Sequence, residues 1–373
     1  MRVLIAGHSL SEIGGVQRYE RDLAAWLLAR GHSPVVYGTD LGDAARELAS
    51  LTIPVTDDLR NVAAPIDVIH GDSPVETMAA LLHFPSTPAL FVCHGWGRLG
   101  RTTPHFPRIV RYVAVDDTCA DRLTLREGIA PAKVSVLLNA VDVDVFRQRA
   151  PLPAKPRRAV VFGNLAHELT FLPAIRDACR RASIEVDVVG ASAGTAVANP
   201  ESILGQYDLA FAKAKCAMEA MACGLAVILC DAAGVGGMVR LAELDRLRRL
   251  NFGIRTLQKP LSAETILAEL ALYDAADVRA VSDRIRETAS SDALHASLLA
   301  LYETVIAEHA GARADWPAES RAAAAFLHDL ALRDRHREDR LWTLAKASQR
   351  VLRLPVVGRA ATRVVDWLIR RKR

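Results

Sequence analysis

The sequence predicts an α/β protein with two doubly wound domains and a basic, helical C-terminal extension. Its 373 residues are too many for one ordinary hydrophobic core. Apolar runs of strand length alternate with segments of helical spacing, and a proline-rich break divides this alternation near the middle of the chain. Because the sequence is 51% hydrophobic and only 5% aromatic, we expect Ala, Val and Leu to fill the two cores.

The first domain begins with a strand–loop–helix–strand unit. Residues 2–7 form a buried-strand pattern, residues 8–15 a glycine-containing loop, and residues 16–30 carry apolar side chains at helical spacing. Gly31 ends this helix, and a second strand follows at residues 34–37. Such a unit implies two parallel strands with a right-handed crossover. Further strands are expected at 66–70, 89–94, 111–115 and 134–138, which gives a first domain of residues 1–150.

The second domain follows a break at residues 149–156. This segment contains three Pro residues and can continue neither a helix nor a central strand. Its expected strands are 159–162, 185–189, 207–211 and 225–230, and residues 261–310 read as helical. We therefore assign residues 156–310 to a second α/β domain.

Residues 311–373 form the extension. A helix is expected at 322–332, a mixed-charge solvated stretch at 333–340, and two short amphipathic helices around Pro355. Residues 341–373 carry nine Lys and Arg and one Asp, a net charge of +8, so the other residues sum to −4 within a whole-chain charge of +4. We expect an anionic membrane surface as the partner; helices packed on the protein's own acidic surface are the alternative, and no nucleic acid is expected.

The expected location is the cytoplasm, with peripheral attachment to the inner face of the membrane. No run of about 18 apolar residues is present, and the apolar start of the chain lacks the features of a signal peptide. The six Cys residues form no CxxC pair and have no His at zinc spacing, so they indicate a cytosolic protein without a metal site.

Gly14 and Gly15 lie in the first strand–helix loop. At the carboxyl end of a first parallel strand, glycines let backbone N–H groups approach a phosphate at a helix N-terminus. The alternative is an ordinary turn. The GxGxxG pattern of dinucleotide-binding folds is absent.

Three segments resemble the retaining GT-B glycosyltransferases of family 4. They are the opening Ile13-Gly14-Gly15 to His32, the segment 133–146 with Asn139, and Met218-Glu219-Ala220 to Ile228. The resemblance implies two Rossmann-like domains facing across a cleft, a nucleotide-sugar donor, a glycan or lipid-linked acceptor, retention at the anomeric carbon, and neither metal nor cofactor. It places Asn139 on the acceptor side.

Glu219 is the strongest single candidate of the donor site. The resemblance gives its carboxylate the ribose hydroxyls as partners, a charge-assisted arrangement. The alternative is a glutamate placed near a helix start because the helix dipole favours it there.

Two departures from the family raise doubt about its usual chemistry. Phe211 stands where the family has an acidic residue, and residues 163–168 lack the family's Arg and Lys for the diphosphate. Lys213 and Lys215 beside the Glu219 helix are the expected replacements, with Lys213 catalytic; both pointing to solvent is the alternative. Gly163 and Asn164 are expected at the donor.

His94 follows a buried strand and resembles the cleft histidine that contacts the donor sugar. Arg98, in the same loop, is expected on the acceptor side, although a loop arginine is more often solvated. Two other functions stay open: a nucleotide-sugar epimerase or hydrolase on the same fold, and a catalytically degenerate scaffold protein.

Overall fold

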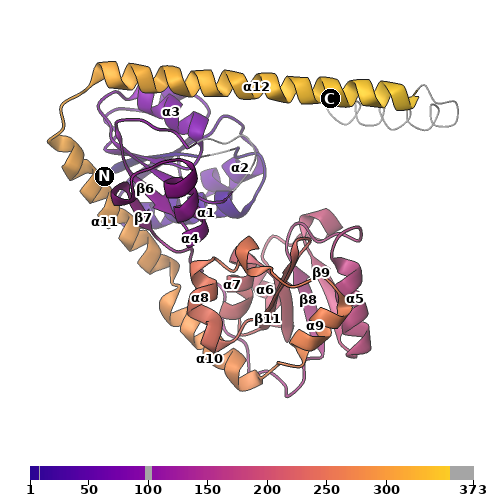
Figure 1. Cartoon of the computed structure of the whole chain (residues 1–373). Helices are drawn as coiled ribbons and strands as arrows, with labels where there is room; N and C mark the ends of the chain where they lie inside the picture. Colours follow the sequence, from indigo (N-terminus) through magenta and orange to yellow (C-terminus); the bar gives the residue numbers. More distant parts are fainter. Residues whose placement is uncertain (8, 97–102, 353–373) are drawn as a thin grey trace. The chain divides into compact units, whose positions relative to one another are not determined.

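The computed structural model describes residues 1–7, 9–96 and 103–352, with side chains described up to residue 335. Its internal contacts divide the chain into two compact units. The larger unit contains residues 1–103 and 108–313 and carries both α/β domains (Figure 1). The smaller unit contains residues 104–107 and 314–373.

The first domain is built on a seven-stranded parallel sheet with the order β3-β2-β1-β4-β5-β6-β7. The predicted strands are confirmed, with ends that shift by at most two residues. The strands are β1 Arg2–Ala6, β2 Ser33–Tyr37, β3 Val55–Thr56, β4 Val68–Gly71, β5 Ala89–Cys93, β6 Ile109–Ala114 and β7 Val134–Val136. The helices between them are α1 Gly15–Ala29, α2 Asp43–Ser50, α3 Pro74–His83 and α4 Asp117–Asp121.

The second domain has a five-stranded sheet with the order β12-β11-β10-β8-β9, in which β12 alone is antiparallel. Its strands are β8 Arg158–Phe162, β9 Glu185–Val189, β10 Leu209–Ala212, β11 Ala226–Asp231 and β12 Gly234–Met238. Its helices are α5 Leu172–Arg181, α6 Glu201–Leu204, α7 Ala214–Ala222, α8 Leu244–Arg249, α9 Ala263–Leu270 and α10 Ala275–Thr288. Both sheets are therefore doubly wound.

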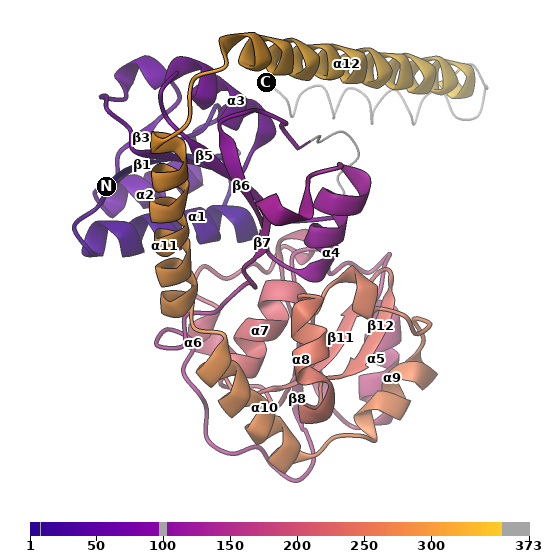
Figure 2. The same cartoon turned by 60° about the vertical axis from the view of Figure 1, so that its left-hand side comes forward.

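Helix α11, Ser291–Ala310, returns from the second domain to the first. It packs on α1 and on strands β4, β5 and β6, as Figure 2 shows. Tyr302, Leu298 and Val305 of α11 are fully buried in this contact. The end of the helical region expected at residues 261–310 thus packs on the first domain.

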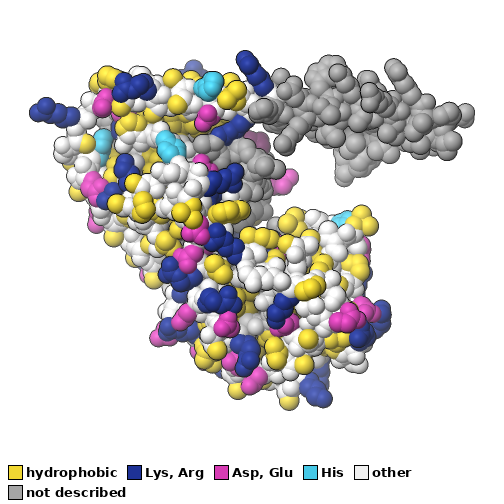
Figure 3. Space-filling view, in the orientation of Figure 1, with side chains coloured by type: hydrophobic (Ala, Val, Ile, Leu, Met, Phe, Trp, Pro, Cys, Tyr) yellow, Lys and Arg dark blue, Asp and Glu magenta, His cyan; other side chains and the backbone are white. Residues whose placement is uncertain are grey.

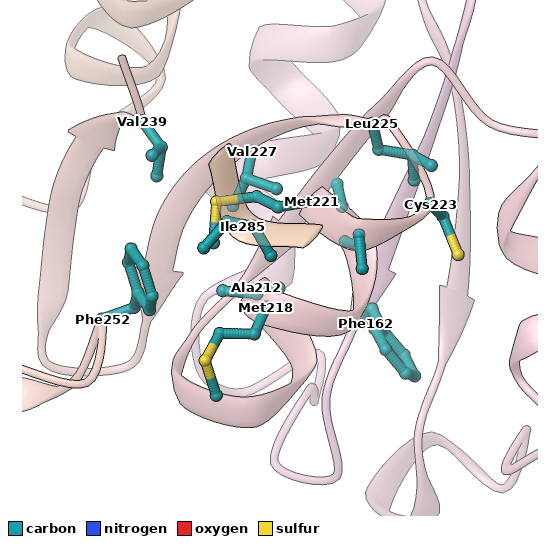
Figure 4. Close-up of a cluster of buried hydrophobic side chains, with 14 of the residues drawn as sticks. Phe162, Ala212, Met218, Met221, Cys223, Leu225, Val227, Val239, Phe252 and Ile285 are labelled. Atoms are coloured by element: carbon teal, nitrogen blue, oxygen red, sulfur yellow. The ribbon is translucent and has the colours of Figure 1, made fainter. Parts of the chain in front are cut away.

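The core of the second domain positions α7. Met218 and Met221 of this helix lie among Phe162, Val227 and Ile285, all buried (Figure 4). These contacts fix one face of α7 against the sheet. Glu219, between the two methionines in sequence, therefore projects from another face.

The extension begins with one long helix, α12 Trp316–Leu352. Residues 333–340, expected to be a mixed-charge solvated stretch after a helix, continue the helix because they contain neither Gly nor Pro. The described side chains of this stretch, 333–335, are at least partly exposed, as predicted. The second predicted amphipathic helix lies outside the described residues. Over the described part of the chain, no helix has the length and apolar composition needed to cross a bilayer.

Candidate functional site

The two sheets bring the predicted site residues to their carboxyl edges. In the first sheet, the strand order reverses between β1 and β4, and in the second between β8 and β10. Ligands of doubly wound sheets bind in the crevice at such points, because neighbouring loops there diverge to opposite faces. Gly14, His94, Gly163 and Lys213 all follow strands at or next to these positions.

The start of α1 offers free backbone donors. Gly14 is the N-cap, in an extended conformation, and no side chain among the described residues caps the helix. A Cβ atom on Gly14 would lie 2.6 Å from Oε1 of Gln17, whereas one on Gly15 would have no neighbour within 4 Å. The first-turn N–H groups of α1 can therefore bind an anion.

His94 is held by a buried carboxylate. Its Nε2 lies 2.8 Å from Oδ1 of Asp72, which follows β4, and the His94 side chain is 14% exposed. The ring of Tyr19 on α1 packs edge-on against His94, with 4.7 Å between the ring centroids. Burial raises the pKa of Asp72, but His70 and His94 outweigh it and lower that pKa well below its usual range. Asp72 is therefore ionised.

Glu219 is a buried carboxyl group in the second half of α7, with 4% of the residue exposed. Burial raises its pKa to about 7, although Lys215 and Arg18 act in the opposite direction. The helix-start interpretation is wrong, because α7 begins at Ala214 and the positive end of its dipole is a turn away. A buried carboxyl with a perturbed pKa beside two cations is typical of a functional site.

Charged groups from both domains meet around Glu219. Nζ of Lys215 on α7 lies 3.6 Å from Oδ2 of Asp22 on α1, and the side chains are 28% and 30% exposed. The guanidinium of Arg18 donates to the carbonyl of Ala198, in the loop after β9, at 3.2 Å. Helix α1 thus directs Arg18 to the Glu219 side and Tyr19 to His94.

Lys213 has a different environment. Its Nζ donates to the carboxylate of Asp231 at the end of β11, and the side chains are 34% and 10% exposed. Lys213 and Lys215 are both ion-paired, so the expectation that both point to solvent is wrong. Between them Ala214 has a φ of +50°, a left-handed conformation that strains a residue with a Cβ atom.

Gly163 and Asn164 form the loop after β8. A Cβ atom on Gly190 would lie 2.1 Å from the carbonyl oxygen of Gly163, so only glycine fits there. Asn164 accepts a hydrogen bond from the N–H of Ala191 at 3.4 Å and is exposed. The loops after β8 and β9 therefore support each other, and Asn164 keeps its amide N–H groups for a ligand.

The remaining predicted residues are less well defined. Asn139 donates its backbone N–H to the carbonyl of Val115 at 3.3 Å, and its acceptor-side role stays a prediction. Arg98 lies outside the described residues. Phe211 is buried inside β10.

Within the described ranges, no three His, Cys, Asp or Glu side chains gather as a metal site would. Transfer without a metal stays a prediction.

Four residues of the site were missed from the sequence: Arg18, Asp22, Asp72 and Asp231. Asp72 and Asp231 each follow a buried strand at its carboxyl end, which is a signal that sequence reading can use. Arg18 and Asp22 lie on the polar face of α1, and only the fold shows that this face meets α7.

Comparison with known proteins supports the fold. Residues 13–145 match the family model described as Glycosyltransferase Family 4. Among solved structures, a glycosyltransferase from Rickettsia africae is similar at 14% identity, with a TM-score of 0.59 and coverage of 82% of this chain and 98% of that one. HepE from Anabaena in complex with UDP is similar at 11% identity and a TM-score of 0.58, and the match covers 81% of this chain and 99% of that one. Sucrose-phosphate synthase from Thermosynechococcus elongatus is similar at 13% identity and a TM-score of 0.50, and the match covers 82% of this chain and 99% of that one. No curated protein matches the sequence.

Proposed function

The chain is a family 4-like protein of the GT-B fold, and on this premise we propose that it is a glycosyltransferase. It transfers a sugar from a nucleotide-diphosphate donor to a glycan or lipid-linked acceptor, with retention at the anomeric carbon and without a metal. The observation that carries the proposal is Glu219, a buried carboxyl at the junction of both domains with Arg18 and Lys215 beside it.

The donor is proposed to bind with its ribose at Glu219. The carboxylate accepts the two hydroxyl hydrogen bonds, and Lys215 with Arg18 faces the diphosphate. Lys215 then exchanges its contact with Asp22 for a phosphate oxygen. HepE, a structural neighbour at low identity, is known in complex with UDP, which agrees with a nucleotide ligand of this class.

The bond between the anomeric carbon and the diphosphate oxygen breaks, and the acceptor oxygen attacks on the face that the diphosphate leaves, which retains the configuration. The proton of the acceptor hydroxyl passes to the leaving phosphate oxygen. The transition state is cation-like, and negative charge builds on the leaving phosphate. Arg18, Lys215 and the first-turn N–H groups of α1 supply positive groups for that charge. His94, fixed by Asp72, is proposed to hold a hydroxyl of the donor sugar.

The basic extension is proposed to bring the enzyme to its acceptor. Each basic residue near an anionic leaflet contributes about 1 kcal/mol, so the net charge of +8 over residues 341–373 suffices for reversible attachment. This favours a lipid-linked acceptor and places the enzyme in the cytoplasm, at the inner face of the membrane.

A second candidate is a degenerate family member that binds a nucleotide without turnover. Phe211 is buried at the position where the family has an acidic residue, and Asp231 already neutralises Lys213. Donor binding without turnover would favour this candidate. Turnover without an acceptor would favour an epimerase or hydrolase.

A thermal-shift panel of UDP, GDP, ADP, CDP and TDP on the wild type and Glu219→Ala tests the proposal. A ligand present at about 100 times its Kd adds about 2.7 kcal/mol to the free energy of unfolding. We expect one nucleotide to raise the Tm of the wild type and not of Glu219→Ala. No shift with any nucleotide would contradict a donor site. Acceptor-dependent release of that nucleotide from its sugar conjugates then tests transfer.

A further inference from the structure

Asp72, which fixes His94, belongs to a longer buried chain of polar side chains, and its other members have no part in the reaction scheme. The hydroxyl of Tyr302 lies 2.7 Å from Nδ1 of His70, and Nε2 of His70 lies 3.3 Å from Oδ2 of Asp72. The other oxygen of Asp72 lies 2.8 Å from Nε2 of His94. The side chains of His70 and Asp72 have no exposed surface.

This chain joins distant parts of the sequence. His70 lies in β4, Asp72 follows that strand, and His94 follows β5. Tyr302 lies on α11, 232 residues after His70, in the helix that returns from the second domain. A buried polar group costs free energy unless it is paired, so four such groups in one row need a structural or functional reason.

The ionised Asp72 dictates where the protons lie. A carboxylate only accepts hydrogen bonds, so Nε2 of His94 carries a proton and donates it to Asp72. Nε2 of His70 lies 3.3 Å from Oδ2 of the same carboxylate without the geometry of a hydrogen bond; it carries a proton too, because a lone pair there would face the anion and repel it. In a neutral His70 ring, Nδ1 is then an acceptor, and Tyr302 donates to it. Burial, followed by Asp72, raises the pKa of Tyr302 well above its usual value, which keeps this donor protonated.

The same reasoning leaves one free acceptor on His94. In a neutral ring with Nε2–H, the Nδ1 atom bears a lone pair, and no described residue is hydrogen-bonded to it. The edge of Tyr19 packs against the ring and, with Asp72, opposes a ring flip. A sugar hydroxyl could donate to this Nδ1, whereas the opposite tautomer would present an N–H there.

We propose that Asp72, His70 and Tyr302 are positioning residues that hold His94 as its Nε2–H tautomer and so present Nδ1 as the acceptor for a donor-sugar hydroxyl. The sugar contact rests on the proposed function, whereas the tautomer does not. Through Tyr302 and its contact with His70, helix α11 takes part in holding His94 in place.

Long-range ¹H–¹⁵N spectra of the ¹⁵N-labelled full chain test the tautomer without any ligand. His94→Gln and His70→Gln assign the two rings by loss of their signals. We expect Nε2 protonated and Nδ1 unprotonated in both rings of the wild type. In Asp72→Asn the carboxamide accepts from one ring and donates to the other, so one ring must change its tautomer. A wild-type His94 with unprotonated Nε2, or unchanged tautomers in Asp72→Asn, would overturn the proposal.

Kinetics test the consequence for catalysis. We expect Asp72→Asn to lower kcat roughly 10²-fold with a smaller change in donor KM, because a mispositioned group costs mainly the transition state. Tyr302→Phe should lower kcat roughly fivefold. Tyr273→Phe is the matched control: it loses a Tyr hydrogen bond, to the carbonyl of Pro153 at 2.8 Å, away from His94. Equal kcat in Tyr302→Phe and Tyr273→Phe would refute the role of Tyr302.

Failure of the proposal and failure of the proposed function are distinguishable. Expected spectra without donor turnover in the wild type would contradict the glycosyltransferase activity and leave the tautomer assignment supported. Donor turnover in a wild type whose His94 is the Nδ1–H tautomer would contradict the positioning role alone. If Asp72→Asn does not fold, Tyr302→Phe and the wild-type spectra still decide the case.

Discussion

At the residue scale, Glu219 links stability to pH. Its pKa is about 7 in the folded protein and 4.5 in an unperturbed chain, so the native state binds the proton more tightly. Below about pH 4.5 both states carry the proton. As pH rises from about 4.5 to 7, the unfolded chain ionises while the buried Glu219 keeps its proton, so the free energy of unfolding falls by on the order of 3 kcal/mol. Stability is therefore lost toward high pH.

Glu219→Gln should remove this penalty. We expect the variant to be more stable than the wild type by about 3 kcal/mol at pH 8 and by roughly 1 kcal/mol at pH 5, measured by urea unfolding. The same change should weaken nucleotide binding, because an amide oxygen is a poorer acceptor than a carboxylate. Glu303→Gln, at an exposed site on α11, is the control. Equal gains at both pH values would contradict a buried, titrating Glu219.

Ala214 is the second residue with a testable backbone state. At a φ of +50°, the Cβ atom of Ala214 destabilises the folded state by about 1–2 kcal/mol. Substitution by Gly removes this strain, but the greater flexibility of Gly in the unfolded chain cancels part of the gain. Ala214→Gly should therefore stabilise the protein by about 0.5–1 kcal/mol. Ala296→Gly, in the exposed middle of α11, should instead lose about 1 kcal/mol. A loss in both variants would show that Ala214 is not left-handed.

At the element scale, the start of α7 separates two lysines by role. Lys213→Met strips the ammonium group from Asp231, whose side chain is 10% exposed and keeps one hydrogen bond, from the N–H of Ala233. We expect a loss of about 1–2 kcal/mol in urea unfolding. Lys215→Met removes the ion pair with Asp22, whose side chains are 28% and 30% exposed, and should change the free energy of unfolding by less than about 0.5 kcal/mol.

Nucleotide binding should show the opposite order, with Lys215→Met affected more than Lys213→Met. Lys215→Met is expected to weaken the nucleoside diphosphate found in the thermal-shift panel roughly tenfold, since one charge-assisted hydrogen bond is lost. Lys213→Met should bind it within about twofold once the folded fraction is taken into account. Weaker binding in Lys213→Met alone would assign the diphosphate to Lys213 and contradict the expected role of Lys215.

Strands with a clear hydrophobic pattern could be predicted from the sequence, whereas strands that form only through pairing with a neighbouring strand could not. The ten predicted strands are Val-, Ile- and Ala-rich runs, and all are present within a few residues. Strand β3 has two residues, and β12 is rich in Gly, so neither has a strand pattern and both exist through pairing with β2 and β11. Residues 333–340 have no apolar period, and the structure nevertheless continues α12 through them.

The site residues likewise fall into those that the sequence identified and those that it did not. Glu219, His94 and the two lysines were identified from motif and position. Asp22 and Tyr302 were not, since each owes its place to a residue far away in sequence. Asp72 was missed although its position after a buried strand is a usable signal. A carboxylate on a helix face reads as a solvated charge until the opposite domain is known.

At the scale of the whole molecule, charge is distributed unevenly. Lys and Arg are interspersed with Asp and Glu over the visible face of the body, as Figure 3 shows, and many pair: Arg249 with Asp117, and Arg255 with Asp121. The basic excess of residues 341–373 has a single Asp to oppose it. A body of paired charges contributes little attraction to an anionic surface, so any membrane affinity should come from the extension.

Flotation with phosphatidylglycerol vesicles tests this on the full-length chain. Replacing Arg370, Arg371, Lys372 and Arg373 by Gln should reduce vesicle binding by a factor on the order of 10²–10³, at about 1 kcal/mol per residue. The control replaces four exposed arginines of the body, Arg46, Arg60, Arg180 and Arg246, by Gln. It removes the same charge and should bind nearly as the wild type does. Binding should also weaken with salt and vanish on phosphatidylcholine. Equal flotation of both variants would mean that the extension has another partner. Cutting the chain at residue 340 is the poorer test, because α12 continues to Leu352.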